Sequence, residues 1–153
     1  MLIFTAKMPR RRILLPAVLL LAVLTVILLV RRGGGAREPS RQAATNEERV
    51  AYLEALGWKV VPEPVETLGL KLPDELTEPY LSYNVLQKEQ GFDLTPLCGR
   101  TLNRYTYRVL NFPNVPDGCL ADLYLCDGVI VAGDVICTGE GGFIAGLDFP
   151  KQE

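Results

Sequence analysis

The sequence CLADLYLCDGVIVAGDVIC, residues 119–137, decides the fold of this chain. It consists of two apolar runs, residues 119–126 and 129–137, joined by the dipeptide Asp127-Gly128. An Asp-Gly link between two apolar runs is the sequence pattern of a type I′ β-hairpin. The second run is apolar at nearly every position, which is typical of a strand that is covered on both faces. These residues therefore predict an antiparallel sheet.

Strands are also expected on the N-terminal side of this hairpin. Residues 101–110 mix polar and apolar side chains and predict a strand that pairs with residues 119–126. The three strands together form an antiparallel meander that ends the sheet. Leucines alternate in residues 65–72, and residues 58–61 are cut off by prolines, so both segments predict shorter strands.

Two helices are expected to complete an α+β fold. Thr45 and Glu48 have the spacing of a capping box, and Gly57 stands where a helix commonly ends. A second helix is expected to start at a cap formed by Asp74 or Thr77 and to end before residue 91. We expect both helices to pack on one face of a mainly antiparallel sheet.

Residues 13–30, ILLPAVLLLAVLTVILLV, predict a transmembrane helix. Eighteen helical residues span about 27 Å, close to the roughly 30 Å of bilayer hydrocarbon. Arginines flank the run on both sides, at 10–12 and at 31–32. A cleaved signal peptide is the alternative, but its apolar core is usually shorter and a small-residue cleavage site follows it directly. We therefore expect an uncleaved signal anchor that holds the chain in the lipid bilayer.

The distribution of charge predicts the topology. Residues 1–41 hold eight basic residues and one acidic residue, whereas residues 42–153 hold eight basic and seventeen acidic residues. The tight N-terminal basic cluster favours a cytoplasmic tail at residues 1–12. Residues 31–44 begin with three glycines and predict a flexible linker. A single-pass plasma-membrane protein with an extracytoplasmic domain at residues 45–153 follows, and its acidity disfavours nucleic acid as a partner.

The sequence predicts no catalytic, cofactor-binding or metal-binding residues. It contains no histidine, and it has neither a phosphate-binding loop nor a metal-ligand spacing. Two acids on one sheet face could form a hydrolytic pair. In the simple register of the hairpin, however, Asp122 lies opposite Gly133 and Asp134 lies opposite Ala121. Because side chains alternate between faces, that register places the two carboxylates on opposite sides of the sheet. A bulge at Gly133 would undo this arrangement, but the simple register argues against a carboxylate pair.

The four cysteines have no CxxC spacing, which disfavours a zinc site. An extracytoplasmic location permits disulfides. The meander predicts the pairs Cys98–Cys126 and Cys119–Cys137, and the second pair requires a one-residue bulge in the hairpin. Free, buried thiols that act as small apolar residues are the alternative.

Four segments of the sequence resemble a known family. They are GWKVVPEPVETLGLKLPDEL (57–76), QKEQGFDLTP (87–96), RYTYRVLN (104–111) and GLDFP (146–150). Residues 47–150 are similar to a family of membrane-anchored bacterial proteins, domain of unknown function 4830. The resemblance implies the domain boundaries and the location, and it implies no activity and no site residues.

The function expected from these observations is binding. A tethered acidic domain without histidine suits a binding or interaction module at the cell surface, with an unknown protein, peptide or cell-wall ligand. Tyr105 and Tyr107 share one strand face and are the candidate binding face, since tyrosines are common at recognition surfaces. A small enzyme that uses Asp, Glu, Tyr or Cys, or an accessory structural subunit of a membrane complex, is the alternative.

Overall fold

The computed structural model describes residues 39–115, 118–138 and 141–150. One compact unit comprises Pro39–Glu153. The predicted tail at residues 1–12 and the predicted transmembrane helix at residues 13–30 lie outside the described residues. Within the described residues, every helix is too short or too polar to cross a bilayer.

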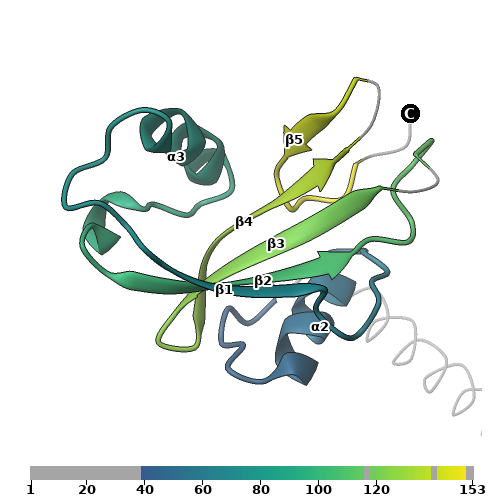
Figure 1. Cartoon of the computed structure of the whole chain (residues 1–153). Coiled ribbons are helices and arrows are strands. Elements are labelled where there is room, and N and C mark those ends of the chain that lie inside the picture. Colours follow the sequence, from purple (N-terminus) through teal and green to yellow (C-terminus); the bar gives the residue numbers. More distant parts are fainter. Residues whose placement is uncertain (1–38, 116–117, 139–140, 151–153) are drawn as a thin grey trace, which may run out of the picture. The chain divides into compact units, whose positions relative to one another are not determined.

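Five strands form one antiparallel sheet, and each strand pairs with the next one along the chain (Figure 1). The strands are β1 (Glu66–Lys71), β2 (Thr101–Arg108), β3 (Cys119–Cys126), β4 (Val129–Cys137) and β5 (Phe143–Ala145). The predicted meander is the centre of this sheet, β2-β3-β4. The sheet extends one strand further than predicted, because the glycine-rich tail contributes β5 beside β4.

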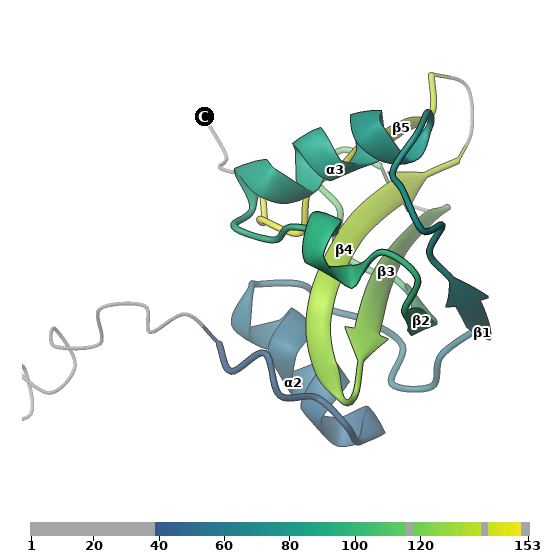
Figure 2. The ribbon, with the colours of Figure 1, turned by 90° about the vertical axis from the view of Figure 1, so that its left-hand side faces the viewer.

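The two helices, α2 (Asn46–Ala55) and α3 (Tyr80–Glu89), lie on opposite faces of the sheet. Figure 2 shows the sheet between them. The expectation that both helices cover one face is therefore wrong. The reason is that the side chains of β3 are buried on both faces: Leu123 packs in the core with α2, and Tyr124 packs in the cluster with α3.

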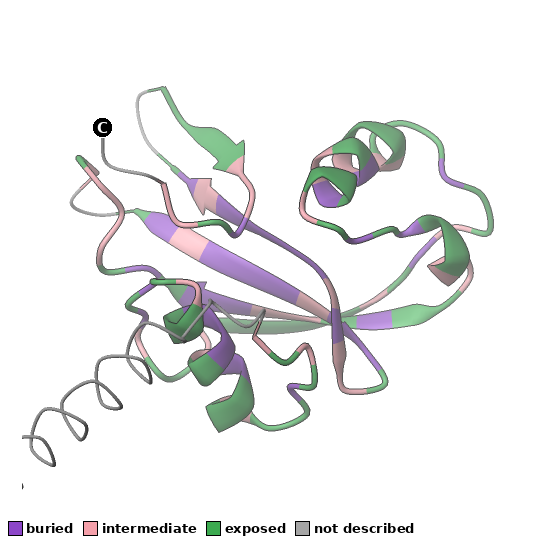
Figure 3. Cartoon of the chain, turned by 180° about the vertical axis from the view of Figure 1, so that it is seen from behind, coloured by how far each residue is buried: buried purple, intermediate pink, exposed green. Residues whose placement is uncertain are grey.

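The face covered by α2 holds the larger apolar core. The predicted capping box is confirmed, because the Thr45 side chain accepts from the Glu48 amide and the Glu48 carboxylate accepts from the Thr45 amide. Leu53 is fully buried on this helix. Trp58 lies beside it and donates its indole N–H to the carbonyl of Leu147 at 2.6 Å. Figure 3 shows that burial runs along the central strands beneath α2.

The β3–β4 hairpin has the predicted turn, with positive φ at Asp127 (51°) and Gly128 (79°). Its register differs from the simple one. Tyr124 pairs with Ala132 but Leu125 pairs with Ile130, so β4 has one extra residue at this point. This β-bulge shifts every later pair by one residue and places Asp122 directly opposite Asp134. The expectation that these two carboxylates point to opposite faces is wrong.

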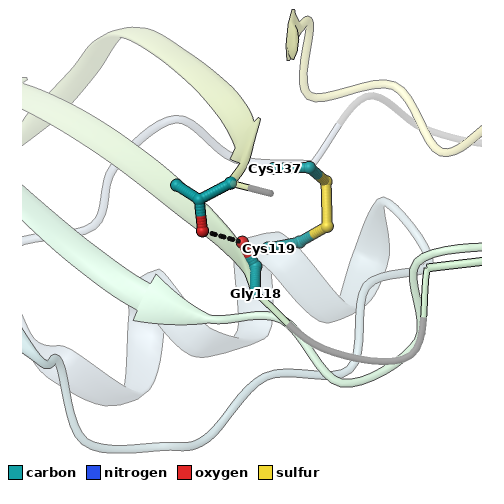
Figure 4. Close-up of a disulfide and its surroundings, with 4 residues drawn as sticks. Gly118, Cys119 and Cys137 are labelled. Carbon is teal, nitrogen blue, oxygen red and sulfur yellow. Dashed lines mark hydrogen bonds between the residues drawn. A yellow bond between two sulfur atoms is a disulfide. The ribbon is translucent and has the colours of Figure 1, made fainter. Parts of the chain in front are cut away.

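The same bulge brings Cys119 opposite Cys137, with Cα atoms 4.0 Å apart, and the two residues form the disulfide shown in Figure 4. This bridge closes the end of the hairpin far from the turn. The second predicted bridge is absent: Cys98 and Cys126 are free thiols. They pack in the apolar cluster beneath α3, where they act as small apolar side chains.

Residues 40–44, which were predicted as part of the linker, belong to the domain. The Arg41 carbonyl accepts from the Ile130 amide, and Ala43 donates to the Gly128 carbonyl. Ala43 is completely buried. The sequence does not indicate that this segment belongs to the domain, because the segment has few apolar side chains and its hydrogen bonds to β4 and the hairpin turn are made by the backbone. The segment before α2 therefore pairs with the start of β4.

Candidate functional site

A cavity of about 570 Å³ lies between α3 and the sheet face that this helix covers. Each of the five strands contributes one lining residue: Leu70, Leu102, Tyr124, Ala132 and Ile144. The start of α3 and its inner face contribute Pro79, Tyr80, Ser82, Tyr83 and Leu86, and Leu72 and Leu94 complete the lining. None of these twelve residues is charged. The cavity is therefore a mainly apolar space whose wall includes three tyrosines.

The position of α3 over this face depends on polar contacts with β4. The buried Gln87 side chain donates to the carbonyl of Gly133 and accepts from its amide, both at 3.0 Å. Gln90 also donates to that carbonyl and accepts from the Leu147 amide. β5 pairs only with residues 135–137 of β4. At Gly133 the two glutamine side chains make the backbone hydrogen bonds that a neighbouring strand would otherwise make. They fix the helix while leaving the space under its first turns open.

α3 begins later than the sequence predicts. Pro79 occupies the N-cap position, and no side chain caps the helix there. The expected caps, Asp74 and Thr77, lie outside the helix, and the leucine at 76 is buried in the preceding loop. Pro79 and the first turns of α3 form one wall of the cavity.

A polar cluster lies at one side of the cavity and consists of Tyr83, Arg104, Asp122, Tyr124 and Asp134. The hydroxyl of Tyr83 donates to Asp134 Oδ2 at 2.5 Å. The rings of Tyr83 and Tyr124 meet edge to face, with centroids 5.9 Å apart. Arg104 lies close enough to Tyr124 for each to shift the pKa of the other. The cluster therefore links the cavity wall to the two opposed carboxylates of β3 and β4.

The two carboxylates have unequal partners. Asp122 accepts from the hydroxyl of Thr106, and its other oxygen lies 3.9 Å from a guanidinium nitrogen of Arg104. Arg104 also pairs with the partly exposed Glu66. Asp134 is 1% exposed, and its Oδ1 atom has no hydrogen-bond partner among the described residues. The cluster and its rim therefore hold three carboxylates and one guanidinium.

Burial controls the acidity of these carboxyl groups. Burial raises the pKa of Asp134 to about 6; the hydrogen bond from Tyr83 opposes this rise and the nearby Asp122 adds to it. Burial also raises the pKa of Asp122, although the hydrogen bond from Thr106 and the charge of Arg104 act against it. Both groups hold their protons at higher pH than an exposed aspartate would.

The remaining members of the cluster keep their ordinary charges at neutral pH. Burial raises the pKa of Tyr83 and of Tyr124, and the negative charge of Asp134 raises both further. For Arg104, burial acts to lower the pKa, but the charge of Asp122 and the hydrogen bond with Tyr124 outweigh it, so the pKa is raised. The tyrosines therefore act as neutral hydroxyls and Arg104 as a fixed cation.

The sequence-predicted binding face does not form an exposed surface. Tyr107 is fully buried beneath α2, where its hydroxyl accepts from Arg49 at 2.8 Å and donates to Asn46. The guanidinium of Arg49 stacks over the Tyr105 ring, 3.7 Å from its centroid. These two tyrosines are core and packing residues. The tyrosines that line a cavity are Tyr83 and Tyr124, together with Tyr80.

Sequence reasoning missed the site because the bulge determines it. The simple register argues against a pair of Asp122 and Asp134, and only a bulge brings the two carboxylates to one face. The sequence places the possible bulge at Gly133, whereas the extra residue in the structure is Val131, between the pairs Tyr124–Ala132 and Leu125–Ile130. Gly133 is required for a different reason, because a Cβ there would lie 2.4 Å from the Leu147 side chain and 2.8 Å from the Asp122 carbonyl. Among the described residues, no group of three or more acidic or cysteine side chains is placed to hold a metal ion.

The fold and the cavity define a small α+β domain with an antiparallel five-stranded meander and an apolar space beneath its second helix. The family model for a domain of unknown function (DUF4830) matches residues 52–135, more than half of the 153-residue chain. The chain belongs to this family, which confirms the resemblance seen in the sequence. Neither the curated proteins nor the solved structures contain a match.

Proposed function

We propose that this domain is a binding module and that its ligand places an apolar part in the cavity beneath α3. The observation that carries the proposal is the cavity itself: about 570 Å³ of space lined by uncharged, mainly apolar residues. Pockets of about 300–1,000 Å³ with few, well-placed polar groups are typical of small-molecule sites. The cavity has room for a ligand or side chain of several carbon atoms, and three tyrosines and one serine are the polar residues in its lining.

A small enzyme is the second candidate function, and the opposed carboxylates of Asp122 and Asp134 favour it. Paired carboxyl groups with raised pKa values are the usual means of acid–base catalysis without histidine. However, the two residues are 3% and 1% exposed, and neither lines the cavity. A substrate in the cavity would meet tyrosine rings first, which supports binding over catalysis.

The proposed location follows from the sequence. Residues 13–30 would anchor the chain in the plasma membrane, with the N-terminus in the cytoplasm and the binding module outside. The domain would then meet peptide, protein or wall components at the cell surface.

Protease added to intact cells is expected to remove an epitope at the C-terminus while an epitope at the N-terminus stays protected. The long apolar run and the basic cluster before it are the physical reasons. Permeabilised cells provide the control, in which both epitopes are lost. Protection of the C-terminal epitope in intact cells would contradict the proposed orientation.

The cavity is tested by filling it. Leu86 lies on the inner face of α3 and lines the cavity, whereas Leu81 lies on the same helix, is 48% exposed and does not line it. We expect Leu86→Trp to weaken the binding of 1-hexanol, a neutral apolar probe, by about tenfold or more, because the indole occupies the same space. Leu81→Trp is the matched control and is expected to change the affinity by less than about twofold.

Isothermal titration of the full-length chain in lipid nanodiscs measures both variants, and empty nanodiscs provide the blank. Thermal unfolding of each variant checks that it is folded. Equal affinities of the wild type and of folded Leu86→Trp for 1-hexanol would show that the probe does not bind in this cavity.

A further inference from the structure

The buried carboxylate beside the cavity lacks a partner for one of its oxygens. Asp134 Oδ2 accepts from Tyr83, but Oδ1 has no hydrogen-bond partner among the described residues although the side chain is 1% exposed. Leaving a buried acceptor unsatisfied is costly, and such an atom in a native fold indicates a missing partner. Ala132, two residues earlier on the same face of β4, lines the cavity. Asp134 therefore lies on the strand face that lines the cavity, beyond the wall that Tyr83 forms.

Negative charge exceeds positive charge around Asp134 Oδ1. The cation of the cluster, Arg104, lies 3.9 Å from Asp122 and pairs with Glu66, and its Nε–H also has no hydrogen-bond partner among the described residues. No cation among the described residues forms an ion pair with Asp134. A ligand that supplied one positive charge would both satisfy the free oxygen and balance the second buried carboxylate.

The wall between the cavity and Asp134 is aromatic. Tyr80, Tyr83 and Tyr124 all line the cavity, and the last two meet edge to face. Aromatic faces attract ammonium groups, and several of them around one space are a common way to hold an alkylated or protonated amine. The hydroxyl of Tyr83, already bonded to Asp134, places the negative charge directly behind these rings.

We propose that the ligand of this cavity is an amine: its apolar body lies beneath α3 and its protonated nitrogen lies among the tyrosine rings and binds Asp134 Oδ1. The inference rests on the proposed binding function and adds the chemical class of the ligand. A neutral hydroxyl could donate to the free oxygen but would leave the charge unbalanced. A carboxylate or phosphate would be repelled by the same oxygen.

Three probes with equal carbon chains separate these cases: n-hexylamine, 1-hexanol and hexanoate. They are titrated calorimetrically at pH 7.5 into the full-length chain in nanodiscs, with empty nanodiscs as the blank. We expect n-hexylamine to bind about tenfold or more tightly than 1-hexanol, and hexanoate to bind most weakly, because a charge-assisted hydrogen bond in a buried site is the strongest of the three contacts.

Asp134→Asn keeps the size of the side chain and removes its charge. This variant is expected to bind the amine and the alcohol with affinities that differ by less than about twofold, because the charge that favours the amine is gone. Asp93→Asn is the matched control, because Asp93 is an exposed carboxylate outside the cavity, and it should keep the wild-type preference. If Asp134→Asn does not fold, the wild type titrated at pH 4.5 gives the same comparison, since Asp134 is then protonated and the preference should disappear.

Equal affinities for n-hexylamine and 1-hexanol at pH 7.5 would overturn the amine inference and leave the binding function intact. Tightest binding of hexanoate, or a preference for the amine that persists in folded Asp134→Asn, would also overturn it. Failure of all three probes to bind would overturn both this inference and the proposed function.

Discussion

Replacing Leu53 with alanine is expected to lower the free energy of unfolding by about 2–5 kcal/mol. The Leu53 side chain is 0% exposed and belongs to the core between α2 and the sheet. The cost combines the lost transfer of a buried side chain from water with the cavity left behind. The loss should lie well above the small values expected for a surface change, because Trp58 and the strand residues around Leu53 are fixed by their own contacts.

Urea unfolding followed by circular dichroism measures this loss. Leu81→Ala is the matched control: it makes the same change on the other helix, at a side chain that is 48% exposed, and should cost within about 0.5 kcal/mol. A loss below about 0.5 kcal/mol for Leu53→Ala would mean that α2 does not cover the sheet as described.

Raising the pH from 4 to 7 is expected to destabilise the domain through Asp134. Burial raises the pKa of this carboxyl to about 6, against an ordinary value of 3.8. Below about pH 4 the Asp134 carboxyl is protonated in both the folded and the unfolded state, so its contribution to stability is fully present. As the pH rises through 6, the folded state must ionise this buried carboxyl, and the contribution is lost. A difference of about two pKa units corresponds to roughly 3 kcal/mol lost across this window.

Unfolding midpoints at pH 4, 5, 6 and 7 for the wild type and Asp134→Asn test this pH dependence. The variant should lose most of the dependence, because an amide cannot ionise, while its oxygen can still accept from Tyr83. The raised pKa of Asp122 acts in the same direction, so some slope should remain. Asp93 acts below the window, since hydrogen bonds from Thr95 lower its pKa to about 2. Identical slopes for wild type and variant would contradict the account.

The elements that could be predicted are those with a local chemical signature. The capping box at Thr45 and Glu48 and the Asp127-Gly128 turn each contain the residue types that their backbone geometry requires. The strands on either side of this turn, β3 and β4, were predicted with the boundaries that the structure has. Alternation of apolar side chains also predicted the position of β2 to within two residues.

The site could not be predicted because it depends on contacts between distant residues. One extra residue in β4 changes which side chains face each other, and apolar runs such as VIVA fit either register equally well. Gln87 looks like a surface residue in the sequence, yet it is fully buried and bonds to the backbone of Gly133. The placement of α3, and with it the cavity, follows from those two features.

The central claim is that an apolar ligand binds in the cavity beneath α3. Nuclear Overhauser contacts between bound 1-hexanol and the aromatic side chains of the protein test it most directly. We expect contacts from the probe to the ring protons of Tyr83 and Tyr124, because both rings form the wall of the cavity beneath α3. Contacts to Phe92 instead would place the probe in the smaller cavity of about 280 Å³ beside Arg41. That result, or a bound probe without contacts to either tyrosine, would contradict the account.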